Sequence, residues 1–317
     1  MSETPAPSAA GASRPPSVTV AVPTRNRARA LVVCLNALSQ LDYPDFEILV
    51  VDNGSTDDTA AVVQGWAATA AVPVRYAFEP QTGTANARNR ALRMSTSDLV
   101  GIVDDDCYPA RDWLQRIAVE FADPLVGYVG GRLLLHDPTD ARFTINDSTV
   151  RVVCRPGVWN SGDDLPGTGM ALRRAAMVQI GGFDPLLGPG SPLRSGEDID
   201  VHWRLWAAGW IGIFTPDAVT YHAHGRKPGS PSLDRIRDDY AIARGGWYAK
   251  RITFGPHRFH TFYAWTVWEL RRQSMITTWK ELRGFFRYLR LAVPRLLRGG
   301  MAMLQPPIDP ISSQSAS

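Results

Sequence analysis

The sequence predicts an α/β fold with a mostly parallel sheet, and three observations support this prediction. From residue 17 onward, short runs rich in β-branched residues alternate with helical stretches, as they do when crossover helices connect parallel strands. Polar residues directly follow several of these runs, at the sheet edge where ligands bind in such folds. The 317 residues are 44% hydrophobic and 21% charged, which is typical of a globular protein with a sizeable core.

The first half of the chain contains four predicted strands. We expect them at residues 17–23, 46–52, 73–79 and 98–106, with helices at about 28–40 and 84–95. Ser55 and Asp58 form a candidate capping box for a further helix after the second strand. This order is that of a nucleotide-binding layout, in which ligands lie beyond the carboxyl ends of the strands.

The second half is mixed and ends in a helical region. We expect strands at 126–135 and 168–172, a helix from near Glu197 to 209, and a pair of strands within 211–222. After the PGSPS break at 228–232 the strand pattern disappears. We therefore divide the chain into four parts: a disordered tail at 1–16, an α/β domain at 17–225, a basic, aromatic-rich helical region at 226–300 and a disordered tail at 301–317.

Charge is distributed unevenly along the chain. Residues 226–300 carry 16 Lys and Arg against 5 Asp and Glu, whereas residues 1–225 carry 18 against 25. An acidic body, suited to a metal ion, is thus joined to a basic C-terminal region.

Cysteine spacing and hydropathy restrict the class of protein further. Cys34, Cys107 and Cys154 lie far apart, and an odd number cannot form a fully paired disulfide framework. We interpret them as reduced thiols of a cytoplasmic protein. The first 17 residues lack the basic start and apolar run of a signal peptide, and no stretch of about 18 apolar residues predicts a transmembrane helix.

Three consecutive carboxylates, Asp104, Asp105 and Asp106, end the fourth predicted strand. Alternate residues of a strand point to the same side, so we expect Asp104 and Asp106 to face one cation and Asp105 to face away or toward the ligand. An all-oxygen site of this kind suits a hard divalent ion such as Mg²⁺ or Mn²⁺. The alternative is a solvated acidic turn.

Polar segments also follow the first two strands. Pro23, Thr24 and Arg25 offer a hydroxyl, exposed amides and a guanidinium for a base, ribose or phosphate. Asp52 and Asn53 lie at the corresponding end of the second strand, where a carboxylate can accept hydrogen bonds from a nucleobase or ribose. Simple turn chemistry is the alternative there.

Two predicted helices carry further candidates. Arg88 and Asn89 lie within the helix after the third strand, either on its surface or facing the nucleotide. Glu197 and Asp198 lie at a helix start, where carboxylates are often only caps. The alternative is that Asp198 is a general base for an acceptor.

Two histidines lie at and just after the end of the last predicted strand, namely His222 and His224. His222 is our candidate for a neutral imidazole ligand of the same cation, with His224 as the competitor for that role. A structural role is the alternative for both.

Taken together, these segments resemble the family 2 glycosyltransferases, which have the GT-A fold, a nucleotide-binding sandwich. The resemblance covers about residues 17–225 and is carried by motifs in the family's order: PTRNR, VVDNGSTD, the helix bearing ARN, DDD, GTGMALRRAAMVQIGGFD, GEDIDVHWR and YHAH. The combination of motifs is far more specific than any single one.

The resemblance implies an inverting transfer of a sugar from a nucleotide-diphosphate sugar to an acceptor hydroxyl. The acceptor would be a glycan, a lipid-linked molecule or a small molecule. It implies these site residues: Asp104 and Asp106 as DxD metal carboxylates, His222 as a metal ligand, Asp52 on the nucleobase side, Asp198 as base, and Pro23, Thr24 and Arg25 along the nucleotide. Trp159, Trp203 and Trp206 are candidates to stack on sugar rings, or core residues.

The basic segment at 259–300 interleaves aromatic and aliphatic residues with arginines. Such a segment can lie on a membrane, here the inner face of the plasma membrane, or form a helical pair folded over the catalytic domain. Nucleic acid is not an expected partner, because unscreened carboxylates repel phosphates. A sugar-phosphate nucleotidyltransferase lacks support because no glycine-rich loop follows the first strand, and a catalytically silent nucleotide-sugar-binding module is a further alternative.

Overall fold

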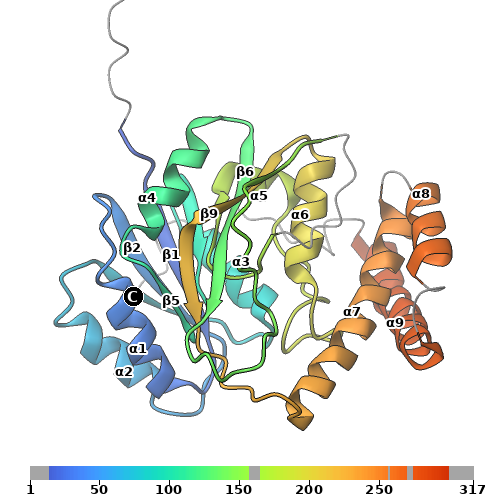
Figure 1. Cartoon of the computed structure of the whole chain (residues 1–317), viewed down its shortest axis with the longest axis horizontal. Helices are drawn as coiled ribbons and strands as arrows, with labels where there is room; N and C mark the ends of the chain where they lie inside the picture. The colour runs from blue at the N-terminus through green and yellow to red at the C-terminus, as the bar shows by residue number, and fades with distance from the viewer. Residues whose placement is uncertain (1–13, 157–164, 256–257, 270–273, 300–317) are drawn as a thin grey trace, which may run out of the picture.

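A single mixed sheet forms the centre of the molecule. The computed structural model describes residues 14–156, 165–255, 258–269 and 274–299, and Figure 1 shows the sheet with helices on both faces. Within these residues the strand order is β3-β2-β1-β4-β8-β6-β9-β5, with β7 paired to β9. Strands β1, β2, β3, β4, β6 and β9 run in one direction and the other three oppose them. The predicted mostly parallel α/β sheet is confirmed.

The strands span Val18–Thr24 (β1), Phe46–Asp52 (β2), Val74–Phe78 (β3), Leu99–Ile102 (β4), Cys107–Pro109 (β5), Val126–Leu135 (β6), Val152–Cys154 (β7), Met170–Arg173 (β8) and Ile211–His222 (β9). The helices span Ala28–Leu38 (α1), Thr59–Ala67 (α2), Thr84–Met94 (α3), Trp113–Ala118 (α4), Arg174–Ile180 (α5), Glu197–Ala207 (α6), Pro231–Phe254 (α7), Arg258–Tyr263 (α8) and Met275–Gly299 (α9), with a π-helical turn at Ala264–Glu269.

Alternating side chains of the central strands fill two separate cores. Val20 and Val22 of β1 pack with α1 and α4 on one face, whereas Ala21 packs with α3 and α5 on the other. The period of two residues explains this division, and burial on both faces explains why the strands are continuously apolar. The sheet is therefore held rigidly between helices, and its carboxyl edge is a fixed platform.

Two strand predictions are wrong in ways that affect the site. The fourth strand ends at Ile102, and Asp104, Asp105 and Asp106 lie in a turn that leads into the short strand β5. Strand alternation therefore does not orient the three carboxylates. The expected strand pair within 211–222 is one strand, β9, whose register against β6 shifts where Thr215 and Val219 oppose consecutive residues.

The predicted capping box is also wrong. Helix α2 begins at Thr59, whose backbone N–H donates to the Asp57 carboxylate. The Ser55 hydroxyl instead accepts a hydrogen bond from the backbone N–H of Asn26. Ser55 thus ties the loop after β2 to the loop after β1, and both loops border the carboxyl edge of the sheet.

Helices α7 and α9 form a closely packed pair at one end of the molecule (Figure 1). A Cβ at Gly284 would lie 1.8 Å from the backbone oxygen of Ile242, so the two helices touch through backbone. The pair is joined to the sheet domain by a buried ammonium: Lys250 Nζ lies 2.8 Å from Asp184 and 2.9 Å from Asp200. The helical region is therefore fixed to α6, which carries Asp200.

The chain ends fall partly outside the described residues. Of the predicted N-terminal tail, residues 14–16 are described and make contacts, since Arg14 pairs with Asp45 and the Pro16 carbonyl accepts from Tyr43. The rest of that tail and the predicted tail at 301–317 lie outside the described part. No helix among the described residues has the length and apolar character needed to cross a bilayer.

Candidate active site

A cleft of about 970 Å³ opens at the carboxyl edge of the sheet. The loop after β1, the acidic turn, the segment before β8, the N-terminus of α6 and the first turns of α7 line it. This is where the order of parallel strands predicts a ligand. It brings together Pro23, Thr24 and Arg25, the three carboxylates, Asp198 and His222, which are far apart in the sequence.

The acidic turn is held by the loop after β1. The Thr24 hydroxyl donates to Asp105 Oδ2 over 2.7 Å, and Arg27 lies 3.2 Å from Asp105 Oδ1 and 3.0 Å from Asp106 Oδ2. Arg27 belongs to the PTRNR segment, but nothing in the sequence distinguishes it from Arg25 as a partner of the carboxylates. Its guanidinium offsets the charges of two of the three adjacent carboxylates. This explains why Asp105 and Asp106 can be buried next to each other.

Neighbouring carboxylates in this turn titrate differently. Burial raises the pKa of Asp105 to about 6, against the opposing charge of Arg27. Burial also acts to raise the pKa of Asp106, but the hydrogen bond and charge of His222, together with Arg27, hold it well below its usual range. Asp106 is therefore the carboxylate of the turn that stays ionised most readily.

Asp106 and His222 form the candidate cation site. His222 Nε2 lies 3.4 Å from Asp106 Oδ1, and both side chains are buried at the cleft wall. Oxygen and imidazole nitrogen are ligands that Mn²⁺ and Mg²⁺ sites use, and Asp104 lies on the same turn with about a third of its side chain exposed. The donors present thus fit a hard divalent ion. Cys107 lies near the pair, but burial raises its thiol pKa and keeps it protonated.

The two histidines are distinguished by their contacts. His224 is buried with Nε2 against the Ala141 carbonyl at 3.0 Å, and its Nδ1 accepts from the backbone N–H of Arg226. Both ring nitrogens of His224 are therefore used within the protein. His222 faces Asp106, so of the two candidates it is the one placed to bind a cation.

Arg88 connects the acidic turn to helix α6. Its guanidinium is almost fully buried and lies 3.2 Å from Asp104 Oδ1 and 3.0 Å from Glu197 Oε1. It also donates to the Gly167 carbonyl over 3.0 Å. Arg88 lines the cleft as expected, but its donors are directed at protein oxygens. The pairing with buried Glu197 was missed, because a spacing of over a hundred residues leaves no signal in the sequence.

Asp198 lies at the N-terminus of α6 and faces the cleft. Its Oδ1 accepts from the backbone N–H of Ile199, and its other oxygen lies against the backbone of Gly167. A Cβ at Gly167 would lie 2.1 Å from Asp198 Oδ2. Glycine at this position is therefore what allows the carboxylate to occupy its place.

Three expected nucleotide contacts are not supported. Both oxygens of Asp52 accept hydrogen bonds, from the Ser55 backbone N–H and the Tyr76 hydroxyl, and Asp52 is buried off the cleft wall. Asn53 borders the cleft, but its amide bonds to backbone atoms of the loop at 79–83. Asn89 is 1% exposed and pairs with the backbone of Phe183. Each of the three side chains binds at least one backbone group that would otherwise be unsatisfied, so each holds a loop in place.

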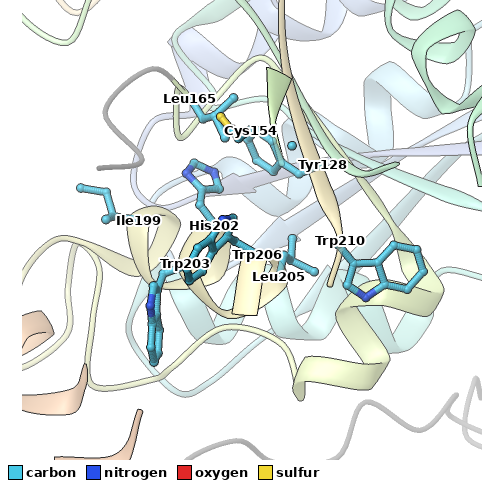
Figure 2. Close-up of a pocket in the computed structure, with 10 residues that line it drawn as sticks. Tyr128, Cys154, Leu165, Ile199, His202, Trp203, Leu205, Trp206 and Trp210 are labelled. Carbon is cyan, nitrogen blue, oxygen red and sulfur yellow. The ribbon is translucent and has the colours of Figure 1, made fainter. Parts of the chain in front are cut away.

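The tryptophans near α6 belong to the core. Trp203 is 8% exposed and lies under Arg251, whose guanidinium carbon is 4.8 Å from the ring centroid. Figure 2 shows the hollow beside α6, where His202 points toward Tyr128 while Trp203 points away. Its free volume of about 30 Å³ holds a water molecule and no sugar ring. The stacking role expected for Trp203 and Trp206 is not supported, and Trp159 lies outside the described residues.

Comparison with known sequences identifies relatives. Residues 19–177 match the family described as "Glycosyl transferase family 2". The "Pre-mycofactocin glycosyltransferase" of Mycobacterium tuberculosis (strain CDC 1551 / Oshkosh) is 31% identical over 230 residues, covering 67% of this chain and 45% of that protein. "Glycosyltransferase AglE" of Haloferax volcanii is 27% identical over 247 residues, covering 75% of this chain and 76% of that one. The chain thus spans less than half the length of the mycobacterial relative.

Two solved structures have a similar fold. The mannosyltransferase PcManGT from Pyrobaculum calidifontis, in complex with GDP-Man and Mn²⁺, superposes with a TM-score of 0.60 at 24% identity over 93% of this chain and 83% of that one. S. aureus TarS 1-349 in complex with UDP gives 0.61 at 17% identity over 92% and 86%. The likeness shows the shared fold and confirms the predicted GT-A type.

Proposed function

The chain belongs to glycosyl transferase family 2, and from this premise we propose that it transfers a sugar from a nucleotide-diphosphate sugar to an acceptor hydroxyl. The observation that carries the proposal is that one cleft contains both a candidate cation site and a candidate general base. The acidic turn with His222 lies on one wall and Asp198 on another, with Arg88 bonded to residues of both. A leaving diphosphate and an attacking hydroxyl need these two kinds of group on opposite sides of a sugar carbon.

The donor would lie along the loop after β1 and the acidic turn. Within the described part of the chain the Arg25 guanidinium lines the cleft and has no protein partner, so it is free to contact a phosphate. Pro23 and Thr24 border the same wall. Relatives in structure support this class of donor, since PcManGT binds GDP-Man and a TarS structure holds UDP-GlcNAc.

A divalent cation, Mn²⁺ or Mg²⁺, would be held by Asp106 and His222 with Asp104 beside them. When bound, such an ion supplies charge that stabilises the departing diphosphate. The Mn²⁺ in the PcManGT complex supports this assignment. The ordered ion pairs of Arg27 keep the acidic turn in one conformation ready for it.

Asp198 would act as the general base. As it takes the acceptor's hydroxyl proton, the acceptor oxygen forms a bond to the anomeric carbon, and the bond from that carbon to the phosphate oxygen breaks with its electron pair leaving on the diphosphate. A single displacement of this kind inverts the anomeric configuration. Because a carboxylate is a weak base, its position contributes much of the effect, and Gly167 and the start of α6 fix that position.

The acceptor would enter between α7 and the loop before β7. Phe143 and Tyr240 line this part of the cleft with their rings stacked, the centroids 5.4 Å apart. Aromatic rings that line a cleft suit the apolar face of a sugar ring. A glycan, a lipid-linked molecule or a small molecule carrying such a ring fits this wall. The three free cysteines, all buried thiols, support a cytoplasmic location for the reaction.

Donor hydrolysis in the absence of acceptor tests the proposal. The purified chain is incubated with UDP-, GDP- and dTDP-sugars in Mn²⁺ or in EDTA, and nucleoside diphosphate release is measured. We expect slow release from at least one donor in Mn²⁺ and loss of that release in EDTA. Release of a nucleoside monophosphate instead would indicate pyrophosphate chemistry, and binding without any release, with or without added glycan acceptors, would indicate a silent binding module.

A further inference from the structure

The surface of α9 that faces away from the molecule carries large apolar side chains beside arginines. Nine exposed residues make up this outer face: Met275, Ile276, Trp279, Arg283, Phe286, Arg287, Arg290, Val293 and Leu297. Trp279 is 66% exposed, Phe286 64% and Leu297 84%. Exposing large apolar side chains to water is unfavourable. Their concentration on one face therefore indicates a surface that binds a partner.

The opposite face of α9 accounts for the helix's own packing. Tyr288 and Ala292 are fully buried with Leu187 and Ala249, and Trp265 stacks on Phe285. The outer face is therefore not needed to hold α9 on the protein. Figure 1 shows α9 and α8 together at the end of the molecule away from the sheet, and α8 exposes Phe259 and Phe262 there.

The outer face is ordered by the helical repeat. Trp279, Phe286 and Val293 recur at intervals of seven residues and form an apolar strip. Arg283, Arg287 and Arg290 are three or four residues apart and form a second strip beside it. A helix with an apolar strip flanked by arginines has the side-chain pattern of one that lies in the plane of a bilayer.

We propose that the outer face of α9 binds the surface of an anionic phospholipid bilayer, with α9 parallel to the membrane. The apolar strip inserts at the boundary of the acyl chains, and the arginines contact anionic headgroups. The charge asymmetry of the chain supports this occupant, since the basic excess lies in residues 226–300. A second copy of the chain fits less well, because a two-fold contact would place one row of arginines against its own copy.

Vesicle flotation of the full chain tests this proposal independently of catalysis. The vesicles are phosphatidylcholine alone, or phosphatidylcholine with about one third phosphatidylglycerol. We expect the wild type to float with the anionic vesicles and much less with the neutral ones. Arg283→Gln, Arg287→Gln and Arg290→Gln together should lower the partition coefficient about a hundredfold, since each cation near an anionic surface contributes a several-fold factor. Trp279→Ser with Phe286→Ser should lower it at least about tenfold on the same vesicles.

Matched variants away from α9 serve as controls. Arg29, Arg111 and Arg235 are exposed, as are the apolar Val119 and Leu125. Arg29→Gln, Arg111→Gln and Arg235→Gln together, or Val119→Ser with Leu125→Ser, should float as the wild type does. All variants change exposed side chains, so each should keep the wild-type melting temperature.

Three results would overturn the proposal. The first is that the wild type stays in the soluble fraction when anionic vesicles are present. The second is equal loss of flotation in the α9 and control variants. The third is a wild-type dimer in sedimentation that the Trp279 and Phe286 changes convert to monomer without changing flotation, which would assign the face to a second copy of the chain.

Discussion

Arg88 shows how one side chain can bring two halves of a site into register. Its guanidinium reaches Asp104, Glu197 and the Gly167 carbonyl, three groups from separate segments. The planar fork of arginine matches several oxygens at once, which a lysine ammonium on a flexible stem cannot do. Burial raises the pKa of Glu197, and the adjacent Arg88 charge opposes that shift. Arg88 is thus a positioning residue that fixes the distance between the acidic turn and α6.

Replacement of the proposed base gives the most specific prediction at the residue scale. Asp198→Asn keeps the size of the side chain and removes its ability to take a proton. We expect kcat for transfer to fall about a hundred- to ten-thousandfold, with the Kd for the nucleoside diphosphate changed by less than about twofold. The Asp58→Asn variant is the control, since Asp58 is exposed at the start of α2 and makes no side-chain cap. Unchanged kcat in Asp198→Asn would remove this residue from the proposed role.

Gly167→Ala tests the position of the same carboxylate without touching its chemistry. The new Cβ would lie 2.1 Å from Asp198 Oδ2 and must displace it. We expect at least about a tenfold loss of transfer and a destabilisation of about 1–3 kcal/mol in denaturant unfolding. The control is Gly65→Ala in helix α2, where the new Cβ would have no atom within 4 Å. There we expect the free energy of unfolding to rise by up to about 1 kcal/mol. Wild-type transfer in Gly167→Ala would show that Asp198 tolerates displacement.

At the scale of elements, the acidic turn shows why the predicted geometry of the three carboxylates was wrong. The sequence shows three carboxylates after an apolar run, but it does not show at which residue the strand ends. The strand stops at Ile102 because its partner β8 pairs only as far as Met170, and Asp105 and Asp106 then turn into β5. Long-range pairing, which local pattern does not encode, decides where these side chains point.

The attachment of α7 to α6 is the second feature at this scale. Lys250 is 2% exposed and lies between Asp184 and Asp200, and the Tyr288 hydroxyl donates to Asp184 over 2.9 Å. Asp200 is two residues after Asp198 on the same helix. The helical region therefore holds the helix that carries the proposed base.

Lys250→Met should therefore destabilise the whole chain. Removing the ammonium leaves Asp184 and Asp200 buried with less compensation, although Arg204 remains 2.7 Å from Asp200. We expect a loss of about 3–5 kcal/mol in the free energy of unfolding. The control is Lys280→Met, because Lys280 pairs with the half-exposed Asp238 and should contribute less than about 1 kcal/mol. Equal stability of the two variants would show that the buried pair does not join the two regions.

At the scale of the whole molecule, much of the architecture follows from sequence. The periods of β1, β2 and α1 predicted a parallel α/β sheet with a ligand edge, and the structure places Thr24, Asp106, Asp198 and His222 there. Short elements such as β5 and β7 were missed, since three residues carry too little pattern. Asp52 and Asn89 were assigned to the nucleotide because their polarity was visible, whereas the backbone groups that bind them were not.

Calorimetric titration of a nucleoside diphosphate tests the central claim, that the acidic turn and His222 bind a cation and through it the donor. UDP, GDP and dTDP are titrated into the wild type and Asp106→Asn, each in Mn²⁺ and in EDTA. We predict that at least one diphosphate binds the wild type in Mn²⁺, and that its affinity falls at least about tenfold in EDTA or in Asp106→Asn. Equal affinity in Mn²⁺ and EDTA, with no effect of Asp106→Asn, would contradict the account.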